Sequence, residues 1–173
     1  LFRSGRTPSN RSVRSRSASS PRSRTSARIS FTAATALALH FVPAAAPALV
    51  YDRAAIFAGE VWRLWTGHEV HWGTAHLGWN LAIFVPAGVW AERLAPSRTR
   101  LFLALAPGAV SLGLLVFAPT LARYAGLSGL ASGILALLAF TQLSARTAER
   151  WFWWGVLALL ALKIGAELFA THP

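Results

Sequence analysis

The sequence contains no cysteine, which excludes a disulfide-stabilised scaffold, a thiolate metal site and a cysteine nucleophile. Charged residues are also scarce. They make up 13% of the 173 residues, against roughly 25% in an average globular domain. Hydrophobic residues make up 54%, and the mean hydropathy is +0.45. A water-soluble globule, a zinc finger and a small secreted domain are therefore poor interpretations of this chain.

Acidic residues are the rarer charged type, and basic residues gather at the N-terminus. Six acidic residues stand against 17 basic ones, and eight arginines lie within residues 1–28, which hold no acid. This segment is mostly Ser and Arg, so we expect a disordered basic tail. Such a tail can hold the N-terminus in the cytoplasm, and it can also attract RNA or anionic lipid. We favour the first interpretation and expect no specific nucleic-acid partner.

The remainder of the chain, residues 29–173, consists of apolar runs separated by more polar connectors. A hydrocarbon core about 30 Å thick needs roughly 20 apolar residues in a helix. Five segments approach this description: Ile29–Val50, His76–Trp90, Leu101–Leu121, Ser128–Leu143 and Trp151–Ala170. We therefore predict an all-α integral membrane domain with five transmembrane helices. A globule with buried helices is the alternative.

Arginines in the connecting loops predict the orientation in the membrane, because short cytoplasmic loops are enriched in Lys and Arg. The loop Ala91–Arg100 has three arginines, and the loop Ser144–Arg150 has two. Both loops should be cytoplasmic, together with the basic tail. The loop Tyr51–Ala75 and the C-terminus are then expected on the external side.

Three polar residues share the external end of this predicted bundle. His76 and Asn80 lie at the start of the second segment, and Ser128 lies at the start of the fourth. Polar side chains at this depth are costly unless they face a bundle interior or a wet cavity. His76 and Asn80 are four residues apart, so both project from one helix face and can donate to one developing oxyanion. Interhelical hydrogen bonds that only hold the bundle together are the alternative.

Ser128 lies in the sequence Gly126-Leu127-Ser128-Gly129, at a predicted transition from loop to helix. Glycine allows another segment to approach closely, and a helix N-terminus offers free N–H groups. The pattern indicates a serine beside an anion-stabilising site. Two structural alternatives remain: Ser128 as a helix cap, and Gly129 with Gly133 as a helix-packing GxxxG motif.

The predicted external loop contains a Trp- and His-rich run in which His68, His71 and His76 raise the question of a metal site. The H-E-x-H spacing is one residue short of the H-E-x-x-H motif of zinc proteases. No carboxylate pair completes a ligand set. We therefore expect hydrogen-bonded histidines in an interfacial loop, and no metal.

Taken together, these motifs resemble the rhomboid family of intramembrane serine proteases. The matching elements are Trp62-Arg63 and His71 in the loop, His76-x-x-x-Asn80 opening the second segment, and Gly126-x-Ser128-Gly129 opening the fourth. The run GEVWRLWTGHEVHWGTAHLGWN resembles the rhombosortase branch, and so do Lys163 and Glu167 in the fifth segment. The resemblance covers about Thr32 to His172.

The resemblance implies a six-helix bundle around a water-filled active site. Ser128 would be the nucleophile, with His76 and Asn80 lining the oxyanion hole. Gly126 and Gly129 would give backbone support. Substrates would be single-span membrane proteins, among them exported proteins with C-terminal Gly-Gly-type anchors. The resemblance also implies a bacterial inner membrane, an active site on the external side, and no metal, ATP or organic cofactor.

The end of the sequence departs from the family pattern, since the family takes its general base from a His in a sixth helix. His172 is the only His after Ser128, and no predicted helix holds it. A serine needs a base to react at neutral pH. We therefore expect a truncated, inactive product in which Gly129, Ser132 and Gly133 face an absent neighbour. The alternatives are a rhomboid-like protein that binds membrane segments without cutting them, and a transporter fragment.

Overall fold

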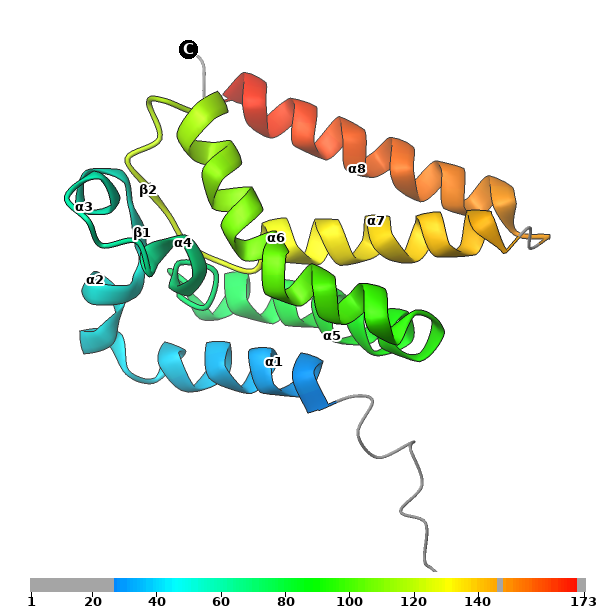
Figure 1. The fold of residues 1–173 in the computed structure, drawn as a ribbon, viewed down its shortest axis with the longest axis horizontal. Coiled ribbons are helices and arrows are strands. Elements are labelled where there is room, and N and C mark those ends of the chain that lie inside the picture. The colour runs from blue at the N-terminus through cyan, green and yellow to red at the C-terminus, as the bar shows by residue number, and fades with distance from the viewer. Residues whose placement is uncertain (1–26, 146–147, 171–173) are drawn as a thin grey trace, which may run out of the picture.

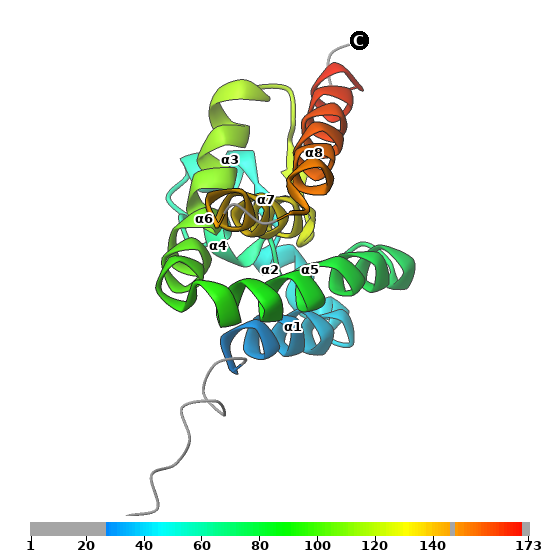
Figure 2. The same cartoon turned by 90° about the vertical axis from the view of Figure 1, so that its right-hand side faces the viewer.

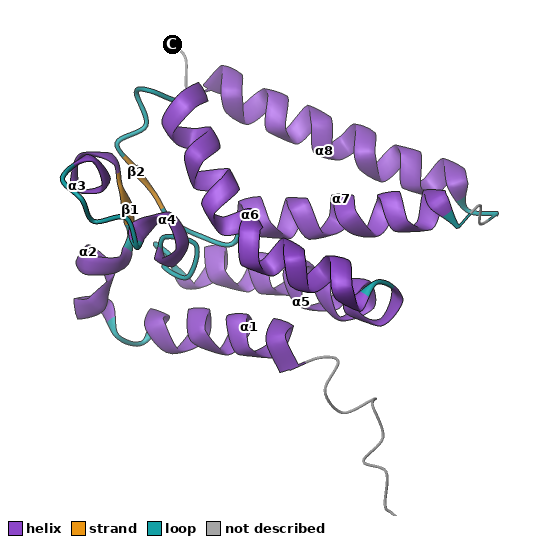
Figure 3. Cartoon of the chain, viewed as in Figure 1, coloured by secondary structure: helices purple, strands orange, loops and turns teal. Residues whose placement is uncertain are grey.

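The computed structural model describes residues 27–145 and 148–170, and most of these residues are helical. Within them, eight α-helices follow one another: α1 Ala27–His40, α2 Ala46–Leu49, α3 Arg53–Phe57, α4 Arg63–Thr66, α5 Thr74–Leu94, α6 Pro96–Phe117, α7 Ser128–Ser144 and α8 Arg150–Ala170 (Figure 1). A short 3-10 helix, η2 Pro43–Ala45, precedes α2. Strands β1 Tyr51–Asp52 and β2 Arg123–Tyr124 form a small antiparallel sheet (Figure 3). The predicted basic tail as far as residue 26 and His172 lie outside the described residues.

The long helices form a bundle in which α7 is central. Helix α7 packs against α5, α6 and α8, and α1 packs against α5 (Figures 1 and 2). The core includes Leu130, Ile134 and Leu138 of α7 together with Phe84 of α5, all of them fully buried. This arrangement places the start of α7, where Ser128 lies, beside the start of α5.

Each of the five predicted segments contains a long helix, but the first segment is broken. Helix α1 ends at His40, and the chain bends by 97° between Ala27–His40 and Pro43–Leu49. Pro43 disfavours a helical backbone at the residue before it, and Val42 has φ −122° and ψ 67°. Among the described residues, α6 is the one unbroken helix that is long and apolar enough to cross a membrane. The bent pair Ala27–His40 and Pro43–Leu49 would be a second, if its two parts form one span. The count of five transmembrane helices therefore stays a prediction.

Small residues on α7 lie against α6. A Cβ on Gly133 would lie 2.7 Å from the ring of Phe102, and a Cβ on Gly129 would lie 3.0 Å from Val110. Ser132, between them, is buried. The prediction that these residues face an absent neighbour is wrong for Gly129 and Gly133. Both use their lack of a side chain to bring α6 close, as small residues do between membrane helices.

Candidate active site

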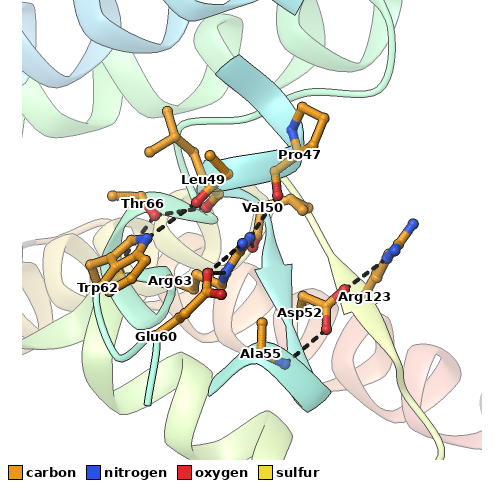
Figure 4. A network of polar contacts seen from close by, with 11 residues as sticks. Pro47, Leu49, Val50, Asp52, Ala55, Glu60, Trp62, Arg63, Thr66 and Arg123 are labelled. Carbon is orange, nitrogen blue, oxygen red and sulfur yellow. Dashed lines mark hydrogen bonds and ion pairs between the residues drawn. The ribbon is translucent and has the colours of Figure 1, made fainter. Parts of the chain in front are cut away.

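The segment between α1 and α5, residues 41–73, is here called the first loop, and the side chain of Arg63 organises it (Figure 4). The guanidinium donates to the carbonyl oxygens of Pro47 and Val50 at 2.8 and 2.9 Å, and it pairs with Glu60 at an N–O distance of 2.6 Å. The neighbouring Trp62 donates from Nε1 to a carbonyl oxygen of α2 at 3.1 Å. The rigid fork of donors in arginine suits it to hold several acceptors at once. Trp62 and Arg63 thus hold the start of α4 against α2.

A two-stranded sheet ties the first loop to the segment that leads into α7. Tyr51 pairs with Tyr124, and Asp52 pairs with Arg123. The Asp52 carboxylate accepts hydrogen bonds from the N–H of Ala55 at 3.1 Å and from Nε of Arg123 at 3.0 Å (Figure 4). These two bonds lower the pKa of the Asp52 carboxyl. The sheet therefore fixes β2 relative to the first loop.

The ring of His71 joins the same two segments. Its Nδ1 lies 3.3 Å from the carbonyl oxygen of Glu69, which can only accept, so Nδ1 carries the proton. Its Nε2 then accepts the N–H of Leu127 at 3.2 Å. Burial lowers the pKa of His71 to about 4, so the ring is neutral at pH 7. His71 therefore holds the residue that precedes Ser128.

His76 and Asn80 of α5 lie against the turn that leads to Ser128. In this turn Gly126 has φ +117°, a region that favours glycine. A Cβ on Gly126 would lie 2.9 Å from Nε2 of His76 and 3.3 Å from Nδ2 of Asn80. Asn80 is 6% exposed, and its Nδ2 has no hydrogen-bond partner among the described residues. The structure thus places His76 and Asn80 against Gly126, two residues before Ser128.

The hydroxyl of Ser128, the first residue of α7, contacts Tyr124. The distance from Ser128 Oγ to Tyr124 Oη is 3.1 Å. Tyr124 Oη also donates to the carbonyl oxygen of Gly126 at 3.0 Å and accepts the N–H of Gly129 at 3.2 Å. Tyr124 was not among the residues predicted from the sequence, because a tyrosine in a loop belongs to no motif considered there. Its position four residues before Ser128 was the available signal.

His68 is buried between the first loop and α6. Its Nε2 donates to the carbonyl oxygen of Pro107 at 3.0 Å and lies 3.1 Å from Oγ of Ser111. The Ser111 hydroxyl in turn donates to the carbonyl oxygen of Leu64 at 2.7 Å. Burial lowers the pKa of His68. His68 thereby links the first loop to α6. Within the described residues, no group of three or more His, Asp or Glu side chains lies close enough together to bind a metal ion.

The pair Lys163 and Glu167 lies on α8. Lys163 Nζ donates to Oε1 of Glu167 at 2.8 Å. The two residues are one helical turn apart on the same face, so the pair balances its two charges within the helix.

Comparison with known proteins gives a family for this chain. The family model described as the rhomboid domain matches residues 58–172, more than half of the sequence. The matched range begins in the first loop and includes every residue predicted for the site. The curated proteins gave no match, and neither did the solved structures. On the strength of the domain match, the chain belongs to the rhomboid family, a family of intramembrane proteases whose members are integral membrane proteins.

Proposed function

We propose that the chain is an intramembrane serine protease in which Ser128 is the nucleophile. The family match supplies the class of protein, and one observation carries the assignment of the site. The buried Nδ2 of Asn80 has no partner among the described residues and lies beside the turn that leads to Ser128. A buried donor without an acceptor costs about 1–3 kcal/mol. The oxyanion that forms when Ser128 attacks a peptide carbonyl is an acceptor that would satisfy this donor.

The proposed oxyanion site combines side-chain and backbone donors. The side chains are the amide of Asn80 and the imidazole of His76. The backbone donor is the N–H of Ser128, one of the N–H groups at the start of a helix that lack an intrahelical acceptor. The N–H groups on either side of it are already bonded to His71 and Tyr124. Donors fixed in a water-poor site before reaction stabilise developing charge without having to reorganise.

The general base is the remaining requirement, because a serine hydroxyl reacts only when a base takes its proton. Three of the described histidines have bonded rings: His40 with Thr74, His68 with Pro107, and His71 with Leu127. The fourth, His76, is assigned to the oxyanion site. We therefore infer that the base comes from outside the described residues, where His172 also lies.

The proposed substrates are membrane proteins with a single transmembrane segment, of the kind with a C-terminal Gly-Gly-type anchor. Two sequence features support this rhombosortase-type assignment: the run from Gly59 to Asn80, and the Lys163–Glu167 pair on α8. The arginine-rich cytoplasmic loops support an active site on the external side of a bacterial inner membrane.

A fluorophosphonate probe tests the nucleophile in the full-length gene product, with its general base present, reconstituted in lipid vesicles. We expect the probe to label the wild type and to leave Ser128→Ala unlabelled. Ser132→Ala is the matched control, since Ser132 is a buried serine one turn further along α7. Labelling of Ser128→Ala at the wild-type level would remove Ser128 from the mechanism, and so would a wild type that does not react.

A second candidate is a rhomboid-like protein that binds transmembrane segments without cutting them. The contact between Ser128 Oγ and Tyr124 Oη favours it, because the hydroxyl is bonded to a phenol rather than to an imidazole. A photo-crosslinking transmembrane peptide would separate the two functions. Crosslinking without cleavage and without probe labelling indicates the binding protein.

A further inference from the structure

We propose that Tyr124 is a positioning residue that fixes the hydroxyl of Ser128 and the turn that carries it. The proposal rests on Ser128 being the nucleophile. It goes beyond that assignment by naming the group that holds the nucleophile before reaction and the part of the molecule that holds this group in place.

The direction of each hydrogen bond at Tyr124 follows from counting protons. The carbonyl oxygen of Gly126 can only accept, so the single phenolic proton of Tyr124 goes to it, over 3.0 Å. The backbone N–H of Gly129 donates to Tyr124 Oη over 3.2 Å. The contact of 3.1 Å with Ser128 then has one consistent assignment, in which the serine donates its proton to Tyr124. Tyr124 Oη therefore makes one donated and two accepted hydrogen bonds.

This arrangement fixes both the nucleophile and its backbone. At rest the proton of Ser128 is directed at Tyr124, so Oγ is held in one rotamer; when Oγ attacks, this proton turns from Tyr124 to the proposed base. The bonds to Gly126 and Gly129 hold the residues before and after Ser128 through the same oxygen atom. A nucleophile placed with this accuracy loses little orientational freedom on the way to the transition state.

The first loop holds Tyr124 in turn. Its backbone pairs with Tyr51 in the sheet, and the neighbouring Arg123 is bonded to Asp52. Its ring lies edge-on to the rings of Tyr51 and His68, with centroid distances of 6.5 and 5.5 Å. The position of the serine is thus set by side chains of the first loop as well as by α7.

The sequence offers a matched pair of variants, because Tyr51 and Tyr124 are its two tyrosines. Tyr124→Phe removes the hydroxyl that bonds Ser128 and keeps the ring. Tyr51→Phe makes the same chemical change at the paired position, where the buried hydroxyl has no hydrogen-bond partner among the described residues. We expect Tyr124→Phe to slow fluorophosphonate labelling and to lower kcat, each about tenfold, with KM nearly unchanged. Tyr51→Phe should react like the wild type.

A spectroscopic measurement tests the contact without relying on catalysis. Protein labelled with ¹³C at Cζ of tyrosine gives two signals, which Tyr124→Phe assigns. Because Ser128 donates to Tyr124, Ser128→Ala should shift the Tyr124 signal and leave the Tyr51 signal in place.

The two measurements together decide the proposal. It stands if the Tyr124 signal shifts in Ser128→Ala and labelling slows in Tyr124→Phe alone. It is overturned by an unmoved Tyr124 signal, by unchanged or faster labelling of Tyr124→Phe, or by equal slowing in Tyr51→Phe. If the wild type does not react with the probe, the proposed function fails. The ¹³C shift then decides by itself whether Tyr124 holds the Ser128 hydroxyl.

Discussion

The first loop and the helical bundle are held together by different kinds of contact. In the first loop, polar groups are joined by directional hydrogen bonds around Arg63 and across the sheet. In the bundle, apolar side chains enter the space that glycines leave, as Ile29 does at Gly88. Directional bonds fix the positions of individual atoms, whereas packing between membrane helices mainly sets how closely the helices approach. The first loop therefore fixes Tyr124 and the turn before Ser128, while the helices of the bundle carry the proposed site residues.

The largest expected effect is a loss of activity on substitution of Asn80, which lies on α5 of the bundle. Asn80→Ala should lower kcat by about 10²–10³, because it removes one donor from the proposed oxyanion site. Its Nδ2 bonds none of the described residues, so removing this donor should not lower the free energy of unfolding. Cleavage kinetics and thermal unfolding of the same preparation check both parts. Unchanged activity with reduced stability would make Asn80 a packing residue.

The largest effect on stability is expected in the first loop. Arg63→Ala should lower the free energy of unfolding by about 3 kcal/mol, since it leaves two carbonyl oxygens and the carboxylate of Glu60 without their donor. Arg63→Lys should recover only part of this loss, because an ammonium lacks the planar fork. Chemical denaturation in detergent measures both variants. Full rescue by lysine would show that charge alone matters there.

Substitutions at two glycines, one in the first loop and one in the bundle, test which region yields more easily to an added side chain. A Cβ on Gly67 in the first loop would lie 2.7 Å from the backbone nitrogen of Tyr51, and one on Gly133 would lie 2.7 Å from the ring of Phe102. A ring can tilt, whereas a paired backbone cannot move alone. We expect Gly67→Ala to cost about 2 kcal/mol and Gly133→Ala about 1 kcal/mol. Gly78→Ala is the control, with open space at its Cβ, and equal losses at Gly67 and Gly133 would erase the contrast.

Buried titratable side chains in the first loop make the stability of the protein depend on pH. Burial raises the pKa of Glu69 to about 7, so the folded chain binds an extra proton and gains stability as the pH falls from 7 towards 4.5. Burial lowers the pKa of His71 to about 4 and also lowers that of His68. These histidines take up protons more readily in the unfolded chain, so they cost stability as the pH falls below 6.5.

Glu69→Gln removes the compensating group. Between pH 6.5 and 4.5, the loss of stability on acidification should steepen by at most about 1.4 kcal/mol per pH unit relative to the wild type. Thermal unfolding at pH 7, 6 and 5 measures the slope. Parallel curves for the two proteins would show that Glu69 does not titrate in this range.

The smallest effect is expected at the exposed ion pair of the sheet. The side chain of Arg123 is 67% exposed, and pairs of this kind contribute about 0–1 kcal/mol. Arg123→Ala should therefore lower the unfolding free energy by less than about 1 kcal/mol, and added salt should shrink the difference further. A loss as large as that of Arg63→Ala would mean that the sheet, and not the arginine network, holds the first loop.

The parts of the fold that repeat a local pattern could be predicted from the sequence. Apolar runs predicted the bounds of α7 and α8 to within a residue. The predicted loop Ala91–Arg100 was wrong, because α5 continues to Leu94 and α6 begins at Pro96. The bend after His40 was missed, since Pro43 was counted inside one straight segment. The orientation of Gly129 and Gly133 towards α6 was also predicted wrongly, because a stripe of small residues does not say which neighbour it accepts.

The candidate site could also be predicted only in part. His76, Asn80 and Ser128 were found as candidates because spacing and helix ends are visible in the sequence. Tyr124 was not, because its role depends on the pairing of β2 with β1 and on the turn at Gly126. Such pairing between distant segments leaves no periodic signal in either of them.

The pairing of Asp52 with Arg123 has a consequence for the order in which the molecule is made. The two residues are 71 positions apart, and α5 and α6 lie between them. During synthesis, both helices must leave the ribosome before β2 can reach β1. Contacts between such distant residues form late, because the entropy of closing the intervening chain has to be overcome first. The contact between Tyr124 and the Ser128 hydroxyl is therefore expected to form among the last steps of folding.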